Sequence, residues 1–411
     1  MEVDILNIPK LRFKEFTDEW IAIKLNDISK TFDYGMNVAS TSFDGKNKYI
    51  RITDIDDVSH KFLKNNIVSP SGSLEDKYLV KNDDILFART GASTGKTYLY
   101  NSNDGILYFA GFLIRINVLK SYNSYFIFQN TLTKKYTDWV KVESIRSGQP
   151  GINAEQYKSY SIKCPTLAEQ NKIANFLSTV DKKIENLENT ITSLENQKKG
   201  LLQQIFSQKL RFKDENGNNY PNWKENIESI KILSGNMYPT TSYINKPGIL
   251  LIQGINITPN KLLLNDCIYI SNDYNEINHV IVKKGDILLG LNRPLINNQL
   301  KICLFDKDFA YLYQRAGILS FNKLKINSLF LYQYLQTDSF KKHLQVELVG
   351  SDQPYIKSNI FNKIKLIFPC LEEQTKIADF LSAFDRKLDN QKAQLEHWQQ
   401  IKKGLLQQMF V

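Results

Sequence analysis

The heptapeptide KKGLLQQ occurs twice in this chain of 411 residues, at residues 198–204 and again at residues 402–408. It ends a longer duplicated stretch, because residues 165–206 and 369–410 match at many positions without a gap, always 204 positions apart. Two amphipathic helices that are alike by chance share composition, but not the order of their residues. The chain therefore contains an internal repeat, and its two copies are expected to share one fold.

The repeated stretch has the pattern of a long pairing helix. Apolar residues recur at steps of four and three from Ile173 through Leu177 and Val180, which places them in one seam. Each copy carries a lysine in this seam, Lys198 or Lys402, and a polar seam residue fixes the alignment of paired helices. We therefore expect an antiparallel pair of helices, each about 60 Å long.

The composition restricts which partners and which kinds of site this protein can have. The formal net charge is +10 and the isoelectric point is near 9.1, which favours an acidic partner such as nucleic acid. The 4 cysteines and 4 histidines are scattered without a CxxC pair, so neither a zinc site nor a disulfide framework is indicated. Neither a leader peptide nor a membrane-spanning run is evident. We expect a reduced, cytoplasmic protein without a membrane partner.

A second repeat concerns the sequence LRFK followed by a tryptophan. It occurs at residues 11–14 before Trp20, and at residues 210–213 before Trp223. The second LRFK directly follows the first long helix, whereas the second long helix has its LRFK at the other end of the chain. We therefore expect the N-terminal segment to pack near the C-terminal helix and to close a pseudo-two-fold repeat into a ring.

The two blocks between the repeats read as copies of one α+β domain. Strands are predicted at residues 50–55, 106–118, 250–257 and 309–321. Ala110 and Gly111 match Ala316 and Gly317 in sequence, and short helices are predicted near Ser124 and Ser328. The predicted division is residues 1–20, 21–164 (first domain), 165–210 (first helix), 211–222 (connector), 223–368 (second domain) and 369–411 (second helix).

The polar loops of the two domains are the candidate DNA-binding sites, and they differ in sequence. Arginine, lysine, amide and hydroxyl side chains are the groups that contact base edges and phosphates. In the first domain the candidates are Arg89, Thr90, Ser93, Thr94, Lys96, Arg146, Ser147 and Gln149. In the second domain they are Asn292, Arg293, Asn297, Asn298, Gln299, Ser351, Asp352 and Gln353.

Catalytic and metal-binding motifs are not apparent. Gly95, Lys96 and Thr97 suggest a phosphate-binding loop, but that motif requires glycine where Thr90 stands. We find neither a glycine-rich dinucleotide fingerprint nor a cluster of acidic residues suited to a metal-dependent nuclease. The chain is therefore predicted to be non-catalytic, with no catalytic residue, metal site or cofactor of its own.

Taken together, the repeated helices ending in KKGLLQQ, the LRFK segments and the first-domain motif VKxxDILFART…STGK resemble the specificity subunit of a type I restriction-modification system. The resemblance covers essentially the whole chain. It implies two target recognition domains, each binding one half of a split site in double-stranded DNA. It also implies two modification subunits docked on the helices, which bind S-adenosylmethionine, and restriction subunits that use ATP and Mg. The second domain departs from the STGK pattern, which leaves Arg293 as its basic candidate.

Two other interpretations stay open at the level of sequence. One is a related type II system in which a similar subunit serves a fused methyltransferase-nuclease. The other is a coiled-coil scaffold whose domains bind proteins and not DNA. The resemblance favours DNA recognition, and it predicts two short unlike half-sites separated by unspecified base pairs.

Overall fold

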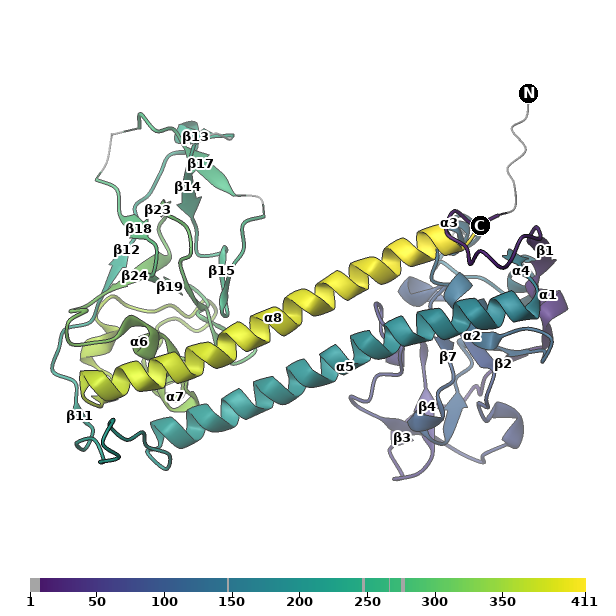
Figure 1. Ribbon diagram of the computed structural model, residues 1–411, viewed down its shortest axis with the longest axis horizontal. Coiled ribbons are helices and arrows are strands. Elements are labelled where there is room, and N and C mark those ends of the chain that lie inside the picture. Colours follow the sequence, from purple (N-terminus) through teal and green to yellow (C-terminus); the bar gives the residue numbers. More distant parts are fainter. Residues whose placement is uncertain (1–7, 146–147, 246–247, 266, 275–277) are drawn as a thin grey trace. The chain divides into compact units, whose positions relative to one another are not determined.

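The computed structural model describes residues 8–145, 148–245, 248–265, 267–274 and 278–411. The chain divides into two compact units, one formed by Met1–Glu188 with Ala393–Val411 and the other by Asn189–Lys392. Each unit contains one domain of strands and short helices, together with part of both long helices, α5 and α8 (Figure 1). The predicted fold class, two tandem α+β domains joined by two long helices, is confirmed.

The first domain is built on a four-stranded antiparallel sheet in the order β2-β9-β6-β7. Three two-stranded pairs, β1-β10, β3-β5 and β4-β8, complete it. Its elements in chain order are β1 (Ile21–Lys24), α1 (Leu25–Ile28), β2 (Ser29–Tyr34), β3 (Ser40–Ser42), β4 (Lys48–Ile50), β5 (Val68–Pro70), β6 (Asp84–Ala88), β7 (Thr97–Leu99), β8 (Leu107–Phe109), β9 (Leu113–Val118), α2 (Ser124–Asn130), α3 (Lys134–Glu143), α4 (Ala154–Ser159) and β10 (Ser161–Cys164).

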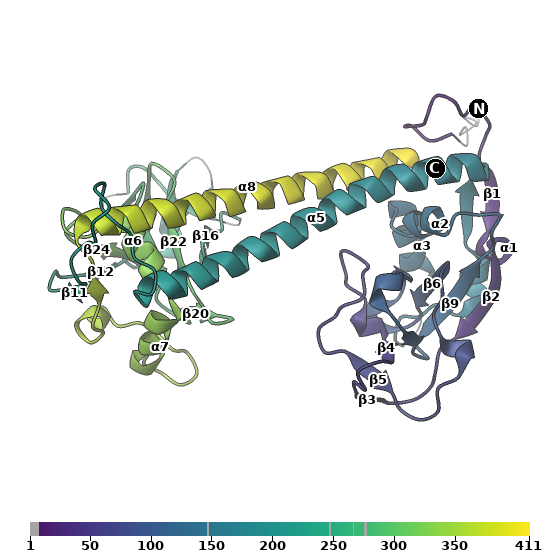
Figure 2. The ribbon, with the colours of Figure 1, turned by 60° about the horizontal axis from the view of Figure 1, so that its bottom comes forward.

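Strand β6 lies at the centre of the first domain's core, and all of its residues are buried. Because successive side chains of a strand point to opposite faces, Ile85 and Phe87 pack in a cluster with residues of α2 and α5. Leu86 and Ala88 pack in a second cluster on the other face with Phe109 of β8. Figure 2 shows β9 between β6 and β2. The continuous apolar sequence of β6 reflects a sheet that is covered on both faces.

The second domain repeats this plan with an enlarged second sheet. Its four-stranded sheet has the order β12-β24-β19-β22, and a five-stranded sheet has the order β13-β17-β14-β23-β18. The elements are β11 (Lys224–Glu225), β12 (Lys231–Ser234), β13 (Tyr243–Ile244), β14 (Ile249–Ile252), β15 (Ile257–Thr258), β16 (Lys261–Leu262), β17 (Ile268–Ile270), β18 (Ile281–Lys283), β19 (Ile287–Gly290), β20 (Leu295–Ile296), β21 (Gln299–Leu300), β22 (Ile302–Leu304), β23 (Phe309–Leu312), β24 (Ala316–Ser320), α6 (Ser328–Tyr334), α7 (Asp338–Glu347) and β25 (Ile367–Phe368).

The long helices are α5 (Leu167–Phe206) and α8 (Leu371–Met409), as the heptad pattern predicts. In the second unit the seam lysine Lys198 pairs with Asp385 at 2.5 Å, and Glu195, one turn earlier, pairs with Lys392, two turns later. The two helices are therefore antiparallel there. In the first unit the other seam lysine, Lys402, pairs with Asp181 at 2.7 Å. The same lysine-aspartate contact, in repeat-equivalent positions, sets the helix alignment in both units.

The LRFK segment clamps the start of each long helix. Arg12 donates two hydrogen bonds of 2.8 Å to the buried carboxylate of Glu169, and Trp20 Nε1 donates a third at 3.3 Å. In the second unit Arg211 and Trp223 bind Glu373 in the same way. Glu169 N donates to Thr166 Oγ1 at 3.5 Å, which is one half of a capping box, while the carboxylate of Glu169 is turned to Arg12 and Trp20.

The two LRFK segments also meet the ends of the long helices alike. Leu210 N donates to Gln204 O at 3.1 Å, where the chain continues from α5 into LRFK. In the first unit Leu11 N donates to Gln408 O at 2.8 Å, although these residues are at opposite ends of the sequence. The N-terminal segment thus occupies, against α8, the place that the connector occupies against α5. Leu11 of the LRFK segment therefore contacts the C-terminal helix directly.

The strands predicted at residues 106–118 and 309–321 are each broken by a turn. β8 pairs in parallel with β4, whereas β9 joins the four-stranded sheet, so the chain changes sheets at residues 110–112. The same change occurs at residues 313–315, between β23 and β24. The strand predicted at residues 50–55 ends at Ile50 and is followed by a 3-10 turn, and the one at 250–257 is divided between β14 and β15.

Ala110 and Gly111 are not the structural counterparts of Ala316 and Gly317, although the two pairs match in sequence. Ala110 bridges Met36, and its structural equivalent is Tyr313, which bridges Asn236. Ala316 instead lies within β24, opposite Gly290 of β19. The sequence match fails because short identical dipeptides are weak markers of equivalence where the domains differ in loop length.

Replacing Asp385 by asparagine is expected to lower the free energy of unfolding by about 1–3 kcal/mol. The reason is that Lys198, whose side chain is 11% exposed, loses its counter-charge. Lys198→Met combined with Asp385→Asn should recover most of this loss, because no charge is then left unpaired in the seam and the asparagine can still accept the hydrogen bond of 2.6 Å from the buried Gln333. Denaturant unfolding measures both effects. Lys392→Ala, which breaks an exposed pair, is the control and should change stability by under about 0.5 kcal/mol. Equal losses in the control and in Asp385→Asn would contradict the role of the seam pair.

Replacing Arg12 by alanine is expected to destabilise the first unit by about 3 kcal/mol, because the buried Glu169 carboxylate loses its cation. Amide hydrogen exchange at the start of α5 should rise with the loss of stability. Arg211→Ala should act in the same way on α8. Lys10→Ala, an exposed cation on the same segment, is the matched control. If Arg12→Ala left exchange at the start of α5 unchanged, the clamp would not hold this helix.

Candidate nucleic-acid interface

Several loops lie together at one end of the strands of each four-stranded sheet. In the first domain β9 is antiparallel to both β2 and β6, so β2 and β6 end at the edge where β9 begins. The segment after Tyr34, the loop at residues 89–96 and the turn at residues 110–112 therefore meet there. In the second domain β12, β19 and β24 create the same edge. We refer to this part of each domain as the loop edge.

In the first domain the loop edge brings the two predicted segments together. Gly91 N donates to Pro150 O at 2.9 Å, and Ile152 N donates to Arg89 O at 2.9 Å. Gly91 has a φ of +73°, and a Cβ atom there would lie 2.9 Å from Nε2 of Gln149. The loop carrying Arg89, Thr90, Ser93 and Thr94 therefore lies against the segment that carries Gln149. Two further predicted residues, Arg146 and Ser147, lie outside the described residues.

The Arg89 side chain is held in place by its neighbours. Its guanidinium carbon lies 4.9 Å from the centroid of the Tyr34 ring, and Nη1 donates to Gly111 O at 3.4 Å. The Tyr34 hydroxyl in turn accepts a bond of 3.1 Å from Ala154 N. A half-buried arginine stacked on an aromatic ring has lost part of its rotamer freedom before any ligand arrives, and this favours specific contacts.

Lys96 is on the same loop but points elsewhere. Its ammonium forms an ion pair with Asp57 and donates to Ile55 O at 3.4 Å, and its side chain is 18% exposed. The neighbouring His60 lies 2.9 Å from Thr97 O, and burial lowers the pKa of this histidine, so it is neutral at pH 7. Lys96 thus ties the loop to the segment at residues 55–57.

In the second domain the same backbone contacts are made by different residues. Arg293 N donates to Pro354 O at 2.7 Å, and Ile356 N donates to Leu291 O at 2.9 Å. Arg293 therefore occupies the place of Gly91, with a φ of +44°, and the buried Leu291 occupies the place of Arg89. Arg293 is exposed, as are the predicted residues Ser351, Asp352 and Gln353 on the adjoining segment. Asn292 lies beside them and bridges Tyr355.

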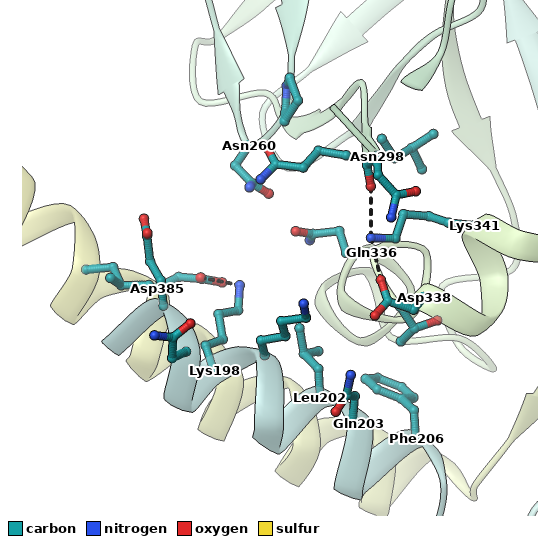
Figure 3. A pocket seen from close by; sticks show the side chains of 18 of the residues that line it. Lys198, Leu202, Gln203, Phe206, Asn260, Asn298, Gln336, Asp338, Lys341 and Asp385 are labelled. Carbon is teal, nitrogen blue, oxygen red and sulfur yellow. Dashed lines mark hydrogen bonds and ion pairs between the residues drawn. The ribbon is translucent and has the colours of Figure 1, made fainter. Parts of the chain in front are cut away.

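The other three predicted residues of the second domain lie on a hairpin formed by β20 and β21. Asn297 and Asn298 make its turn with positive φ values, as a two-residue turn of this type requires. They line, with Gln299, a pocket of about 770 Å³ whose other walls include residues of α5, α7 and α8 together with Pro259 and Asn260. Figure 3 shows Lys341 of α7 between Asn298 and Asp338, and its Nζ donates to Asn298 O at 3.1 Å. The structure therefore divides the predicted set of this domain into the loop edge and the hairpin.

Because of this hairpin, Lys96 and Lys301 do not align in the sequence, although they are structural counterparts. Gly290 N donates to Lys301 O at 2.8 Å, just as Ala88 N donates to Lys96 O at 2.8 Å. Lys301 is therefore the counterpart of Lys96, displaced in sequence by the residues of the hairpin. Its side chain is buried, its Nζ lies 3.5 Å from Asn292 O, and burial lowers its pKa. The similarity of Lys96–Leu99 to Lys301–Leu304 is the signal that identifies it.

Among the residues that the structure describes, no three histidine, cysteine or acidic side chains are grouped so that they would hold a metal ion. Within the same residues, none of the helices combines the length and the apolar character that crossing a membrane requires.

Comparison with known proteins identifies the repeated unit. The model of the type I restriction modification DNA specificity domain matches residues 17–196 and 213–397. The type I restriction enzyme MjaVIII specificity subunit of Methanocaldococcus jannaschii is 28% identical over 362 residues, covering 85% of this chain and 83% of the relative. The putative MjaX specificity subunit of the same organism is 26% identical over 434 residues, covering 97% and 95%.

Solved structures agree at the level of the fold. The S subunit of a type I restriction-modification system from M. genitalium matches with a TM-score of 0.62 at 17% identity, covering 98% of this chain and 99% of that one. A chain from a study of complex assembly and conformational transition of the type I system matches with a TM-score of 0.51 at 15% identity, covering 94% and 96%. Both neighbours support the arrangement of two tandem domains.

Replacing Arg89 by alanine is expected to weaken discrimination at one base pair by about 1–3 kcal/mol, if its guanidinium contacts a base edge. Arg293→Ala should do the same at a different base pair. Fluorescence anisotropy with single-base variants of the preferred duplex measures both. Lys120→Ala, an exposed cation at the opposite edge of the first domain's sheet, is the control. Unchanged affinity and unchanged preference in both arginine variants would exclude the loop edge as the reading surface.

Proposed function

The chain belongs to the family of type I restriction modification DNA specificity domains and is a specificity subunit of such a system, and from this premise we propose that each of its domains reads one half of a bipartite site in double-stranded DNA. The reading surface is the loop edge of each four-stranded sheet. Arg89 and Gln149 belong to it in the first domain, and Arg293 and Gln353 in the second.

One observation carries this proposal: both domains build the same backbone frame and fill it with different side chains. The bonds of Gly91 and Ile152 in the first domain recur at Arg293 and Ile356 in the second. Gly91 of the first domain is replaced by the exposed Arg293 in the second, and the half-buried Arg89 is replaced by the buried Leu291, so the donors that the two frames offer to a ligand differ. A protein that reads two unlike short sequences needs this combination of fixed frame and varied contacts.

The long helices provide the second part of the proposed function, which is docking of two modification subunits. Lys183, Lys199 and Gln203 on α5 are exposed, and identical residues are exposed at the repeat-equivalent positions of α8. Exposed residues contribute little to folding, so their identity in both repeats favours two equal docking surfaces. Two equal surfaces suit two copies of one partner.

In the proposed complex the chemistry belongs to the partners. The modification subunits bind S-adenosylmethionine and methylate adenine, and the restriction subunits use ATP and Mg. This chain contributes recognition and docking, carries no catalytic residue, and acts in the cytoplasm. The relatives named above favour this assignment over a fused type II enzyme or a scaffold that does not bind DNA.

Exchanging residues 21–164 for the corresponding domain of a relative should change one half of the methylated motif and leave the other half and the gap unchanged. The physical reason is that each domain has its own core and its own loop edge. Methylome sequencing of cells carrying the partners gives the motif for the parent and the exchanged chain. Exchange of residues 223–368 is the reciprocal control. A continuous motif in the parent, or a change in both halves after one exchange, would contradict the proposal.

A further inference from the structure

The turns that join β8 to β9 and β23 to β24 occupy the same place in the two domains. Arg89 N donates to Phe112 O at 3.0 Å, and Leu291 N donates to Arg315 O at 3.0 Å. Since Leu291 is the structural counterpart of Arg89, Phe112 and Arg315 are counterparts as well. Both are the last residue of their turn, directly before β9 or β24.

In the first domain this turn presents an aromatic ring to solvent. Phe112 is 59% exposed, although Leu113, the next residue along the chain, is fully buried. Gly111, the residue before it, accepts the hydrogen bond from the Arg89 guanidinium. An exposed phenylalanine contributes little to a core, so its place beside the half-buried arginine calls for a role at the surface.

In the second domain the same position holds an arginine on a constrained backbone. Arg315 is exposed and has a φ of +68°, a conformation that is unfavourable for a residue with a side chain. Gly254 lies against it, since a Cβ atom at Gly254 would come within 2.6 Å of Arg315 O. Strained conformations that persist because the surrounding structure fixes them are concentrated at functional sites.

We propose that Phe112 and Arg315 are specificity-determining residues that read a base in their respective half-sites. This rests on the proposed function, because it adds a third contact segment to each loop edge. Phe112 contacts the methyl group of a thymine, and Arg315 donates to O6 and N7 of a guanine, which are the base features that these side chains recognise in the major groove. One position thus carries an apolar contact in one domain and a charged donor in the other, so the two half-sites differ there.

The test uses the purified complex of this chain with its modification subunits and duplexes that carry single modified bases. Replacing each thymine of the first half-site in turn by uracil removes one methyl group. We expect one position at which wild-type binding falls by about 5- to 10-fold. Phe112→Ala should bind the parent duplex more weakly and should be insensitive to uracil at that position. Ile21→Ala, an exposed apolar residue on β1, is the control and should retain the wild-type response.

For the second half-site, replacing each guanine by 7-deazaguanine removes the N7 acceptor. We expect one position at which the wild-type complex loses about 10-fold in affinity and Arg315→Ala loses nothing further. Lys284→Ala, an exposed cation before β19 at the opposite edge of the same sheet, should respond like wild type. Arg315→Lys distinguishes a bidentate contact to guanine from a contact that needs only a positive charge, because lysine preserves the charge but not the bidentate geometry.

The outcomes separate this inference from the function on which it rests. If the wild-type complex does not prefer the parent duplex to one with both half-sites scrambled, the proposed function fails. If it prefers the parent duplex but no uracil or 7-deazaguanine weakens its binding, the proposed function stands and the inference is wrong. If wild type discriminates and both alanine variants keep the full response to the modified bases, the proposed function stands and the role of these turns is wrong. An equal loss for every duplex, with the modified-base response retained, would show a contact to the DNA backbone and would also overturn the inference.

Discussion

Two buried carboxylates anchor this fold. Glu169 and Glu373 stand at the starts of α5 and α8, and each is held by the arginine of an LRFK segment and by the tryptophan that follows it in the sequence. A buried carboxylate is tolerated because these donors compensate for the water it has lost. The tryptophans belong to the domain cores, so the clamp fixes a domain and a helix to each other within one unit. The seam pairs of Lys198 and Lys402 then set the alignment of the helices.

The side chains of the loop edge differ between the two domains, whereas the clamps that anchor the long helices are the same in both. The central strands β6 and β19 are buried on both faces, and their identity is restricted by packing. The residues that follow them are restricted mainly by a few backbone hydrogen bonds, which many side chains can satisfy. The second domain uses this freedom twice, with Arg293 in the place of a glycine and with a hairpin before Lys301. Variation in contacts therefore need not disturb the core.

The sequence predicts those features that repeat with a regular period. The long helices, their antiparallel pairing and the adjacency of the LRFK segment to α8 follow from the heptad seam and the duplication, because burial of an apolar stripe leaves few alternatives. The broken strands do not follow, since a change of sheet at residues 110–112 leaves the apolar pattern almost unaltered. Because the apolar pattern continues through these turns, the sequence places Phe112 and Arg315 within predicted strands.

The site is predictable in part. The loops after β6 and β19 and the segments at Gln149 and Gln353 are identified from their polar composition, and the structure brings each pair together. The direction of a side chain within a loop is not encoded in composition, so the pairing of Lys96 with Asp57 is visible only in three dimensions. An insertion also shifts the numbering, and Lys301 cannot be matched with Lys96 until backbone hydrogen bonds are compared.

The packing of Phe410 has a consequence for the order in which the chain folds. Its ring stacks on Phe126 at 5.2 Å and meets Trp20 edge-on at 6.3 Å, so it fills part of the first domain's core. A ribosome has made all the strands of that domain, and then the whole second domain, before it reaches residue 410. The core of the first domain therefore remains incomplete until α8 emerges from the ribosome. Synthesis from the N-terminus makes the second unit, whose residues are contiguous from Asn189 to Lys392, the first one that can be finished.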